Sequence, residues 1–354
     1  MKKRSLLFVV LVLVIRIASA QSDVVEFIKT GPKNASKLME AYLNPYALAL
    51  GDGLNNGWYY TAETHERFGF DFSMSVSAVR IPESGKTFDL SQLGLQNIAF
   101  DPSNSIAQTI AGSDLAGPEI AVLDPNSPQD TLTSFLSPEG VGMDIVPIPI
   151  AQLGIGLLPH TDILIRYVPK LRFNQDGDQA EDVRVGLIGL GAKHSFKDWI
   201  PGLKALPFDA AVFGSYSAID ANSGINFQLS DYGVNPPSGY VPDENQELKI
   251  KTNTMKFGLI VSKKVALLTF FGSIGHSQSK TTVDLLGRYP VITEVGVGKV
   301  VVEDEVDPIH MNFESSQLSL DAGVRMKLSF FNVFASISKA EYTSLNAGIA
   351  LSVR

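Results

Sequence analysis

FGFDFSMSVSA, at residues 68–78, places an apolar side chain at every even position and glycine, aspartate or serine at every odd position. Side chains point alternately to the two faces of a β-strand, so this pattern predicts a strand with one apolar and one polar face. LSLDAGVRMKLSF, at residues 318–330, repeats the pattern. Both segments reach the roughly 9–11 residues that a tilted strand needs to cross a bilayer.

Weaker alternation follows at residues 151–157, 163–173 and 208–216. Residues 345–353 alternate almost to the chain end and resemble the terminal-strand signal that the assembly machinery of outer-membrane barrels reads. The alternation predicts an all-β fold, a transmembrane antiparallel β-barrel. A soluble β-sandwich or a lipocalin-like barrel is the alternative, because both also alternate.

The composition excludes several other classes of protein. Of the 354 residues, 45% are hydrophobic and 19% are charged, which excludes general disorder. Because the chain has no cysteine, it has no disulfide scaffold, thiol nucleophile or cysteine-held metal. A net charge of −8 argues against nucleic acid as a partner.

The N-terminal 20 residues predict an export signal. Lys2, Lys3 and Arg4 precede an apolar run at residues 6–15, and Ala18-Ser19-Ala20 is typical of a cleavage site after Ala20. A single membrane anchor is the alternative, but the run is shorter than the roughly 20 residues such a helix needs. No comparable run follows, so strands closed into a barrel are the remaining way to span, and the outer membrane is the predicted location.

Residues 21–57 have a helical rather than an alternating pattern. Apolar residues from position 35 to 42 recur with helical spacing, and Asn44-Pro45 predicts the start of a second short helix. Two short helices here predict a plug, or hatch, folded into the lumen of a barrel formed by residues 58–354. A periplasmic cap or a segment on the membrane surface is the alternative. The predicted plug residues are Leu38, Met39, Tyr42, Asn44, Pro45, Tyr46 and Leu50.

The remaining chain length accommodates about 12–14 strands. Residues 98–140 lack alternation and contain five prolines, which predicts a long extracellular loop. A second loop is predicted at about residues 220–246.

Several short blocks resemble an uncharacterised family of Gram-negative outer-membrane barrels. They are YLNPY at 42–46, GLNNGWY at 53–59, GFD at 69–71, KTFD at 86–89, KH at 193–194, WIPG at 199–202 and LP at 206–207. That family in turn is distantly similar to the long-chain fatty acid transporters, which pair an N-terminal hatch with a barrel. The resemblance implies a transport barrel and identifies no ligand-binding residue.

No catalytic motif is present. The chain has no Gly-x-Ser-x-Gly elbow, and neither His194-Ser195 nor His276-Ser277 has the His-x-Ser spacing of outer-membrane lipid A deacylases. The acidic turn at 174–182 does not match an EF-hand loop, and the five histidines are dispersed. We therefore expect no enzyme activity, no cofactor and no metal.

Cations on the polar faces are the candidates for solute contact. They are Arg166, Lys170, Arg172, Arg325 and Lys327. The alternative is that they pair with lumen carboxylates such as Asp71 and Asp321, or with the plug. The predicted function is a passive channel or transporter for a small apolar or amphipathic solute, gated by the plug. A structural or partner-binding barrel is the alternative and a lipid-modifying enzyme is a weaker one; outer-membrane lipid is the expected surrounding partner.

Overall fold

The computed structural model describes residues 26–174, 182–200, 205–232, 234, 240–241, 243, 245–296 and 299–353. The predicted signal peptide, its cleavage site and most of the acidic turn at 174–182 lie outside these ranges.

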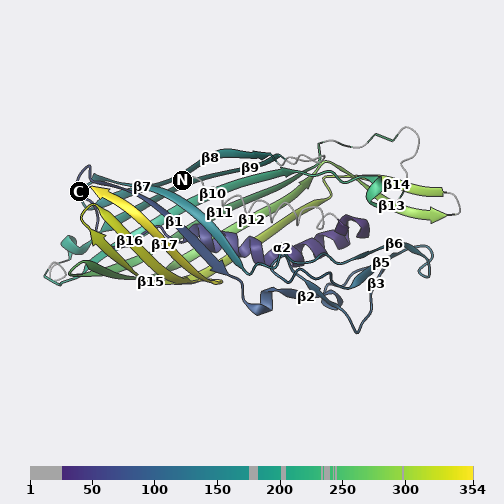
Figure 1. Cartoon of the computed structure of the whole chain (residues 1–354), viewed down its shortest axis with the longest axis horizontal. Coiled ribbons are helices and arrows are strands. Elements are labelled where there is room, and N and C mark those ends of the chain that lie inside the picture. The colour runs from purple at the N-terminus through teal and green to yellow at the C-terminus, as the bar shows by residue number, and fades with distance from the viewer. Residues whose placement is uncertain are drawn as a thin grey trace.

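Ten antiparallel strands close into a barrel in the order β1-β17-β16-β15-β12-β11-β10-β9-β8-β7 (Figure 1). The strands are β1 (Phe70–Arg80), β7 (Ile145–Leu158), β8 (Thr161–Asn174), β9 (Asp182–Ser195), β10 (Asp209–Gly224), β11 (Glu247–Val265), β12 (Leu268–Leu286), β15 (Ile309–Leu328), β16 (Phe331–Lys339) and β17 (Thr343–Val353). The predicted transmembrane antiparallel barrel is confirmed.

The predicted number of 12–14 strands is wrong, because several strands are longer than predicted and part of the chain lies outside the barrel. Strands β11, β12 and β15 contain 19, 19 and 20 residues, about twice what crossing a membrane needs. A further part of the chain, between β1 and β7 and between β12 and β15, forms small sheets outside the barrel. The same length therefore closes a narrower barrel.

The two ends of the barrel differ. Strands β7 and β8, β11 and β12, and β15 and β16 are joined by tight turns at one end, where β1 also begins and β17 ends. Each of these turns contains a residue with positive φ: His160, Ala266 and Ser329. We call this the short-turn end and the opposite one the long-loop end (Figure 1).

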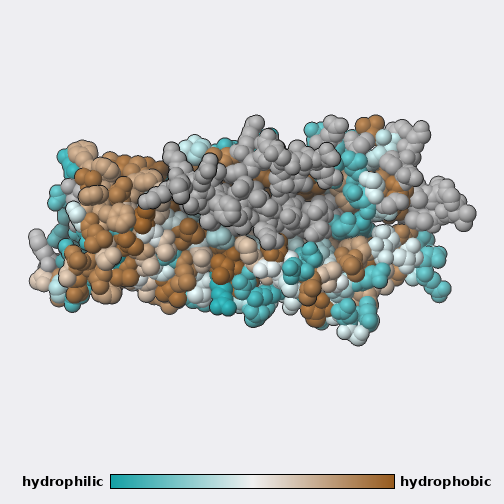
Figure 2. Space-filling view, in the orientation of Figure 1, coloured by the Kyte–Doolittle hydropathy of each residue, from teal (hydrophilic) through white to brown (hydrophobic). Residues whose placement is uncertain are grey.

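The outer surface is apolar toward the short-turn end, as Figure 2 shows. On β15, Leu318 is 60% exposed whereas the next residue, Ser319, is 1% exposed. On β1, Phe70 and Phe72 are exposed and Asp71 is buried. The predicted facing of the two alternating segments is therefore confirmed: apolar side chains point outward and polar ones point into the lumen. Among the described residues, no helix is long and apolar enough to span a membrane.

In the described part of the chain, one α-helix, α2 (Pro32–Asn55), runs along the inside of the barrel after a short 3-10 turn, η1 (Glu26–Thr30) (Figure 1). The prediction of two short helices is wrong at Asn44, which is exposed within α2 rather than capping a new helix. Pro45 lies inside the helix. A proline normally disrupts a helix, but α2 packs along β1, β7, β11, β12 and β15, and this packing keeps its two halves continuous.

The long-loop end carries most of the remaining elements, whereas the 3-10 turn η4 (Lys197–Trp199) lies at the short-turn end between β9 and β10. Between β1 and β7 lie η2 (Glu83–Gly85), β2 (Thr87–Asp89), η3 (Leu90–Gln92), β3 (Ile98–Ala99), β4 (Ile106–Gln108), β5 (Glu119–Leu123) and β6 (Thr131–Leu136). They form the sheets β2–β4 and β3–β5–β6, so the predicted loop at 98–140 contains short strands. A hairpin of β13 (Arg288–Gly296) and β14 (Lys299–Val306) rises beside them, and a core around Phe27, Tyr42 and Phe135 joins the N-terminal segment to the β3–β5–β6 sheet.

Candidate functional site in the barrel lumen

The C-terminal half of α2 fits the lumen closely. Gly51 lies against Ser279 of β12 and Gly53 against Ile148 of β7, and a Cβ atom at either glycine would overlap the opposing side chain. Two glycines of one helix thus touch opposite sectors of the wall. The helix fills the barrel at this level because ten strands enclose a narrow interior.

Arg166 of β8 anchors the end of the helix. Its guanidinium group donates to the carbonyls of Leu54 and Asn56 at 2.8 and 2.7 Å and to Oε1 of Gln152 at 3.0 Å, and its side chain is fully buried. The last carbonyls of a helix have no partner within the helix and carry partial negative charge. The buried Arg166 guanidinium supplies hydrogen bonds to these carbonyls and a positive charge beside their partial negative charge. Asn55 adds a 2.7 Å hydrogen bond to Ser277 Oγ of β12.

Three consecutive aromatic residues follow the helix and point to different sectors of the wall. Trp58 stacks under Arg166, with the guanidinium carbon 3.7 Å from the ring centroid. Its ring lies directly against Gly189 and Gly191 of β9, where added Cβ atoms would come within 3.1 and 3.0 Å of the indole. Glycine at these inward positions therefore makes room for the indole.

Tyr59 binds the opposite wall. Its hydroxyl donates to Oδ2 of Asp321 on β15 at 2.6 Å. Lys256 of β11 forms an ion pair with the same carboxylate at 2.9 Å, and Ser273 and Ser338 donate to it. This buried carboxylate is fully hydrogen-bonded, as a charge inside a protein must be.

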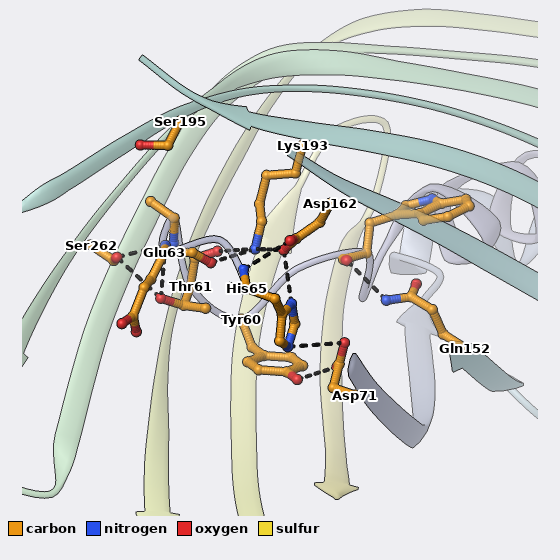
Figure 3. A network of polar contacts seen from close by, with 12 residues as sticks. Tyr60, Thr61, Glu63, His65, Asp71, Gln152, Asp162, Lys193, Ser195 and Ser262 are labelled. Carbon is orange, nitrogen blue, oxygen red and sulfur yellow. Dashed lines mark hydrogen bonds and ion pairs between the residues drawn. The ribbon is translucent and has the colours of Figure 1, made fainter. Parts of the chain in front are cut away.

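Tyr60 and His65 bind a third sector, shown in Figure 3. Tyr60 donates to Asp71 of β1. The ring of His65 lies between two carboxylates, with Nδ1 3.1 Å from Asp162 of β8 and Nε2 3.6 Å from Asp71. Lys193 of β9 completes the cluster, 3.1 Å from Asp162 and 2.7 Å from the carbonyl of Glu63.

The lumen segment packs closely against the wall at this level. The residues around Trp58, Tyr60 and His65 leave a cavity of only about 20 Å³, enough for about one water molecule. Because β1 begins at Phe70, the segment that occupies the lumen extends beyond the predicted residues 21–57.

The predicted solute-contact residues have different surroundings. Arg166 and Arg325 are buried and contact the lumen segment, Arg325 through Glu63 at 3.5 Å. Lys327 is half-buried near the short-turn end. Lys170 lies in a bulge of β8 and is exposed, paired with Asp220 at 2.9 Å, so it is not among the buried lumen residues. The side chain of Arg172 lies outside the described part.

The predicted plug residues lie on both faces of α2. Leu38, Met39, Tyr42 and Pro45 are buried, Tyr46 and Leu50 are half-buried, and Asn44 is exposed. Burial raises the pKa of Tyr46, so its hydroxyl stays protonated and donates to the carbonyl of Met143 at 2.9 Å.

Sequence reasoning missed Tyr60, His65, Asp162 and Lys193. A signal for Asp162 was present, because it shares the inward alternation of β8 with Leu164 and Arg166. His65 gave no such signal, since it lies in an irregular segment whose position depends on the closed barrel.

A second, larger cavity, open to solvent, lies beside the first half of α2, toward the long-loop end. It measures about 500 Å³, and the helix lines one side of it with the exposed residues Lys37, Glu40 and Asn44. The opposite side is formed by Ser84, Gly85, Thr87, Phe88 and Leu93, and Tyr342 lies at one edge. The wall is low here because β16 and β17 contain 9 and 11 residues whereas β15 contains 20 (Figure 1). The exposed stripe of the plug helix therefore faces a cavity outside the closed part of the barrel.

Residues 1–353 match the model of a family of unknown function, DUF6588. The chain belongs to this family. The predicted resemblance to an uncharacterised family is thereby confirmed. No curated protein matches the chain in sequence.

The chain also matches solved structures, each at low sequence identity. The translocator domain of the autotransporter NalP from Neisseria meningitidis is 10% identical, with a TM-score of 0.32 over 87% of this chain and 93% of that chain. The Pseudomonas putida toluene transporter TodX is 10% identical, with a TM-score of 0.30 over 89% of this chain and 70% of that chain. The attachment invasion locus protein Ail of Yersinia pestis is 9% identical, with a TM-score of 0.25 over 81% of this chain and 99% of that chain.

Proposed function

We propose that this protein is a gated channel of the outer membrane, closed in the described conformation by its own N-terminal segment. The observation that carries the proposal is the position of α2, which plugs the closed barrel with one half and presents a cavity of about 500 Å³ with the other. A ligand in that cavity touches the plug directly. Binding and gating, rather than catalysis, are the proposed activity.

The orientation of the barrel follows from its turns. Outer-membrane barrels keep short turns on the periplasmic side and long loops outside. The cavity and η1 then lie on the outward side, and the apolar band toward the short-turn end contacts membrane lipid. Export by the N-terminal signal, with cleavage after Ala20, brings the chain to this membrane.

The contacts of the lower plug are suited to reversible release. Tyr59, Tyr60 and His65 contact the wall through hydrogen bonds and ion pairs, whose partners can be satisfied by water when the plug moves. Trp58 contacts it through a cation–π contact with Arg166 and close packing on β9. An entirely apolar plug would instead expose apolar surface to water, which costs roughly 25 cal/mol of free energy per Å².

The lining of the larger cavity suggests the class of solute. Lys37, Glu40 and Asn44 provide polar groups on one side, and Phe88 and Leu93 provide apolar surface on the other. Its volume lies within the roughly 300–1,000 Å³ of small-molecule sites. A small amphipathic solute fits this combination best.

A disulfide that locks the plug tests the proposal. Asn55→Cys with Ser277→Cys joins α2 to β12 at a contact of 2.7 Å, in a chain without other cysteines. Thr252→Cys with Thr281→Cys joins β11 to β12 at 2.9 Å and serves as the matched control within the wall. In proteoliposomes, we expect uptake of a radiolabelled phenyl glucoside to stop in the oxidised plug pair, to return on reduction, and to be unaffected by the wall pair.

A second candidate is a partner-binding barrel whose plug never moves. This candidate is favoured by the close fit of Gly51 and Gly53 and by the contacts that hold the lumen segment to three sectors of the wall. Two results together would support this candidate and contradict the channel. The wild-type protein would take up no more solute than empty vesicles do, and oxidation of the plug pair would not change uptake.

A further inference from the structure

His65 is placed at the joint between the plug and the wall. It follows the aromatic residues that fill the lumen and precedes β1, which begins at Phe70. Its backbone N–H donates to Oδ1 of Asp162 at 2.8 Å, and its ring is almost fully enclosed (Figure 3). A change in this residue therefore acts where the mobile part of the proposed channel meets its fixed part.

Both ring nitrogens of His65 face carboxylates, Nδ1 toward Asp162 and Nε2 toward Asp71. Nδ1, at 3.1 Å, is within hydrogen-bond distance of Asp162, and Nε2, at 3.6 Å, is at ion-pair distance from Asp71. A neutral imidazole carries one N–H and no charge, whereas an imidazolium carries an N–H on both nitrogens and attracts both carboxylates. Asp71 already accepts from Tyr60, but a carboxylate has room for further donors. The geometry is thus complementary to the protonated ring.

The surrounding charges lead to the same conclusion. The groups that line the small cavity with His65 are the carboxylates of Asp71, Asp162 and Glu63 and the cations of Lys193 and Arg325, from β1, β8, the lumen segment, β9 and β15. Lys193 pairs with Asp162 and Arg325 with Glu63, and a protonated His65 adds a positive charge beside Asp71. A buried carboxylate is stabilised by such a partner.

We propose that His65 is a proton-binding site that controls the seating of the plug, held by Asp162 and Asp71 when protonated and loosened when neutral. The inference rests on the proposed function, since it assigns a regulator to that gate. Histidine is the side chain that ordinarily changes charge between about pH 5 and pH 8. Stability from the protonated state is present at acidic pH and is lost as the pH rises, so the plug is seated in acid and released toward alkaline pH.

Trp58 provides a direct measure of plug seating. The chain contains two tryptophans, so Trp199→Phe leaves Trp58 as the only indole emission of the full-length protein. In detergent micelles, collisional quenching by acrylamide reports the exposure of this buried ring. We expect the exposed fraction of Trp58 to rise from about pH 5.5 to about pH 8, the range in which histidine ordinarily changes charge.

Two variants make the charge argument testable. His65→Gln removes the protonation, and we expect high quenching at both pH values. Asp71→Asn removes one of the two carboxylates that hold the protonated ring, so we expect quenching at about pH 5.5 to rise toward its value at about pH 8; unchanged quenching would show that Asp71 does not hold the ring. Heat-modifiable migration on gels checks that each barrel is assembled. Quenching that is the same at both pH values in the Trp199→Phe protein, or pH dependence that persists in His65→Gln, would overturn the switch.

The outcome also separates the switch from the channel. If quenching follows pH as expected but solute uptake never exceeds that of empty vesicles, the switch stands and the channel fails. If uptake stops when the plug pair is oxidised and returns on reduction, while Trp58 quenching does not change with pH, the channel stands and the switch fails.

Discussion

Arg166 of β8 stacks on Trp58 of the lumen segment and caps the carbonyls of Leu54 and Asn56 in the same arrangement. One buried cation therefore holds both the end of the plug helix and the first aromatic residue after it. An inward cation of this kind looks like a solute contact in the sequence, but its hydrogen bonds go to the protein's own backbone.

Arg166→Met should unseat the end of α2. Methionine keeps much of the apolar length but leaves two buried carbonyls without a donor, at about 1–3 kcal/mol each. We expect Trp58 quenching to increase in the Trp199→Phe protein while gel migration of the folded barrel is retained. Arg166→Met with unchanged quenching would show that the guanidinium group does not hold the plug.

Gly191→Val should displace Trp58 from the wall of β9. A Cβ atom here would lie 3.0 Å from the indole ring, and overpacking of this kind costs about 1–3 kcal/mol. Gly214→Val on β10 is the matched control, because no heavy atom lies within 4 Å of a Cβ at Gly214. Trp58 quenching should rise only in the Gly191 variant; an equal rise in both would contradict the contact.

Strand β15 tests the position of the membrane. Leu320 faces outward in the apolar band, so Leu320→Arg should impair assembly by roughly 2–4 kcal/mol near the middle of a bilayer. Ser316→Arg on the same outward face lies beyond the band and should be tolerated. Folded and unfolded forms are separated by gel migration, and equal assembly of the two variants would show that the band does not lie in lipid.

Ser319→Arg tests the lumen side of the same strand. Sequence alternation alone predicts that a polar lumen position tolerates arginine. Because Ser319 is buried, we expect the added side chain to displace the plug while leaving the barrel closed. Increased protease cleavage of α2 with normal gel migration is the expected result, and a fully protected helix would contradict it.

The cavity beside α2 is tested by filling it. Asn44→Tyr projects a larger side chain into this space, and we expect severalfold lower uptake of phenyl glucoside. Lys33→Tyr is the control, because Lys33 is exposed on the same helix but does not line the cavity. Trp58 quenching should be unchanged in both, and equal uptake by the two variants would remove the cavity from the solute path.

The facing of β1 and β15 could be predicted from the sequence because alternation is a local property with a period of two residues. Residues 68–78 and 318–330 carry that information within each strand. The presence of a helix at the N-terminus was predicted for the same reason, since its apolar residues recur within one or two turns. Membership of one family could also be recognised from the sequence alone.

Other features depended on contacts between distant parts of the chain. Ten strands rather than 12–14, and one helix through Pro45 rather than two, follow from how strand lengths and packing close the barrel. His65 and Asp162 are 97 residues apart, and Tyr59 and Asp321 are 262 apart. No local sequence pattern indicates such pairs. In the unfolded chain each charge is hydrated, and it needs a partner only when the closed barrel buries it. Alternation in β1 and β15 indicated which side chains face inward, whereas the exposed position of Lys170 and the partners of the inward side chains depended on how the barrel closes.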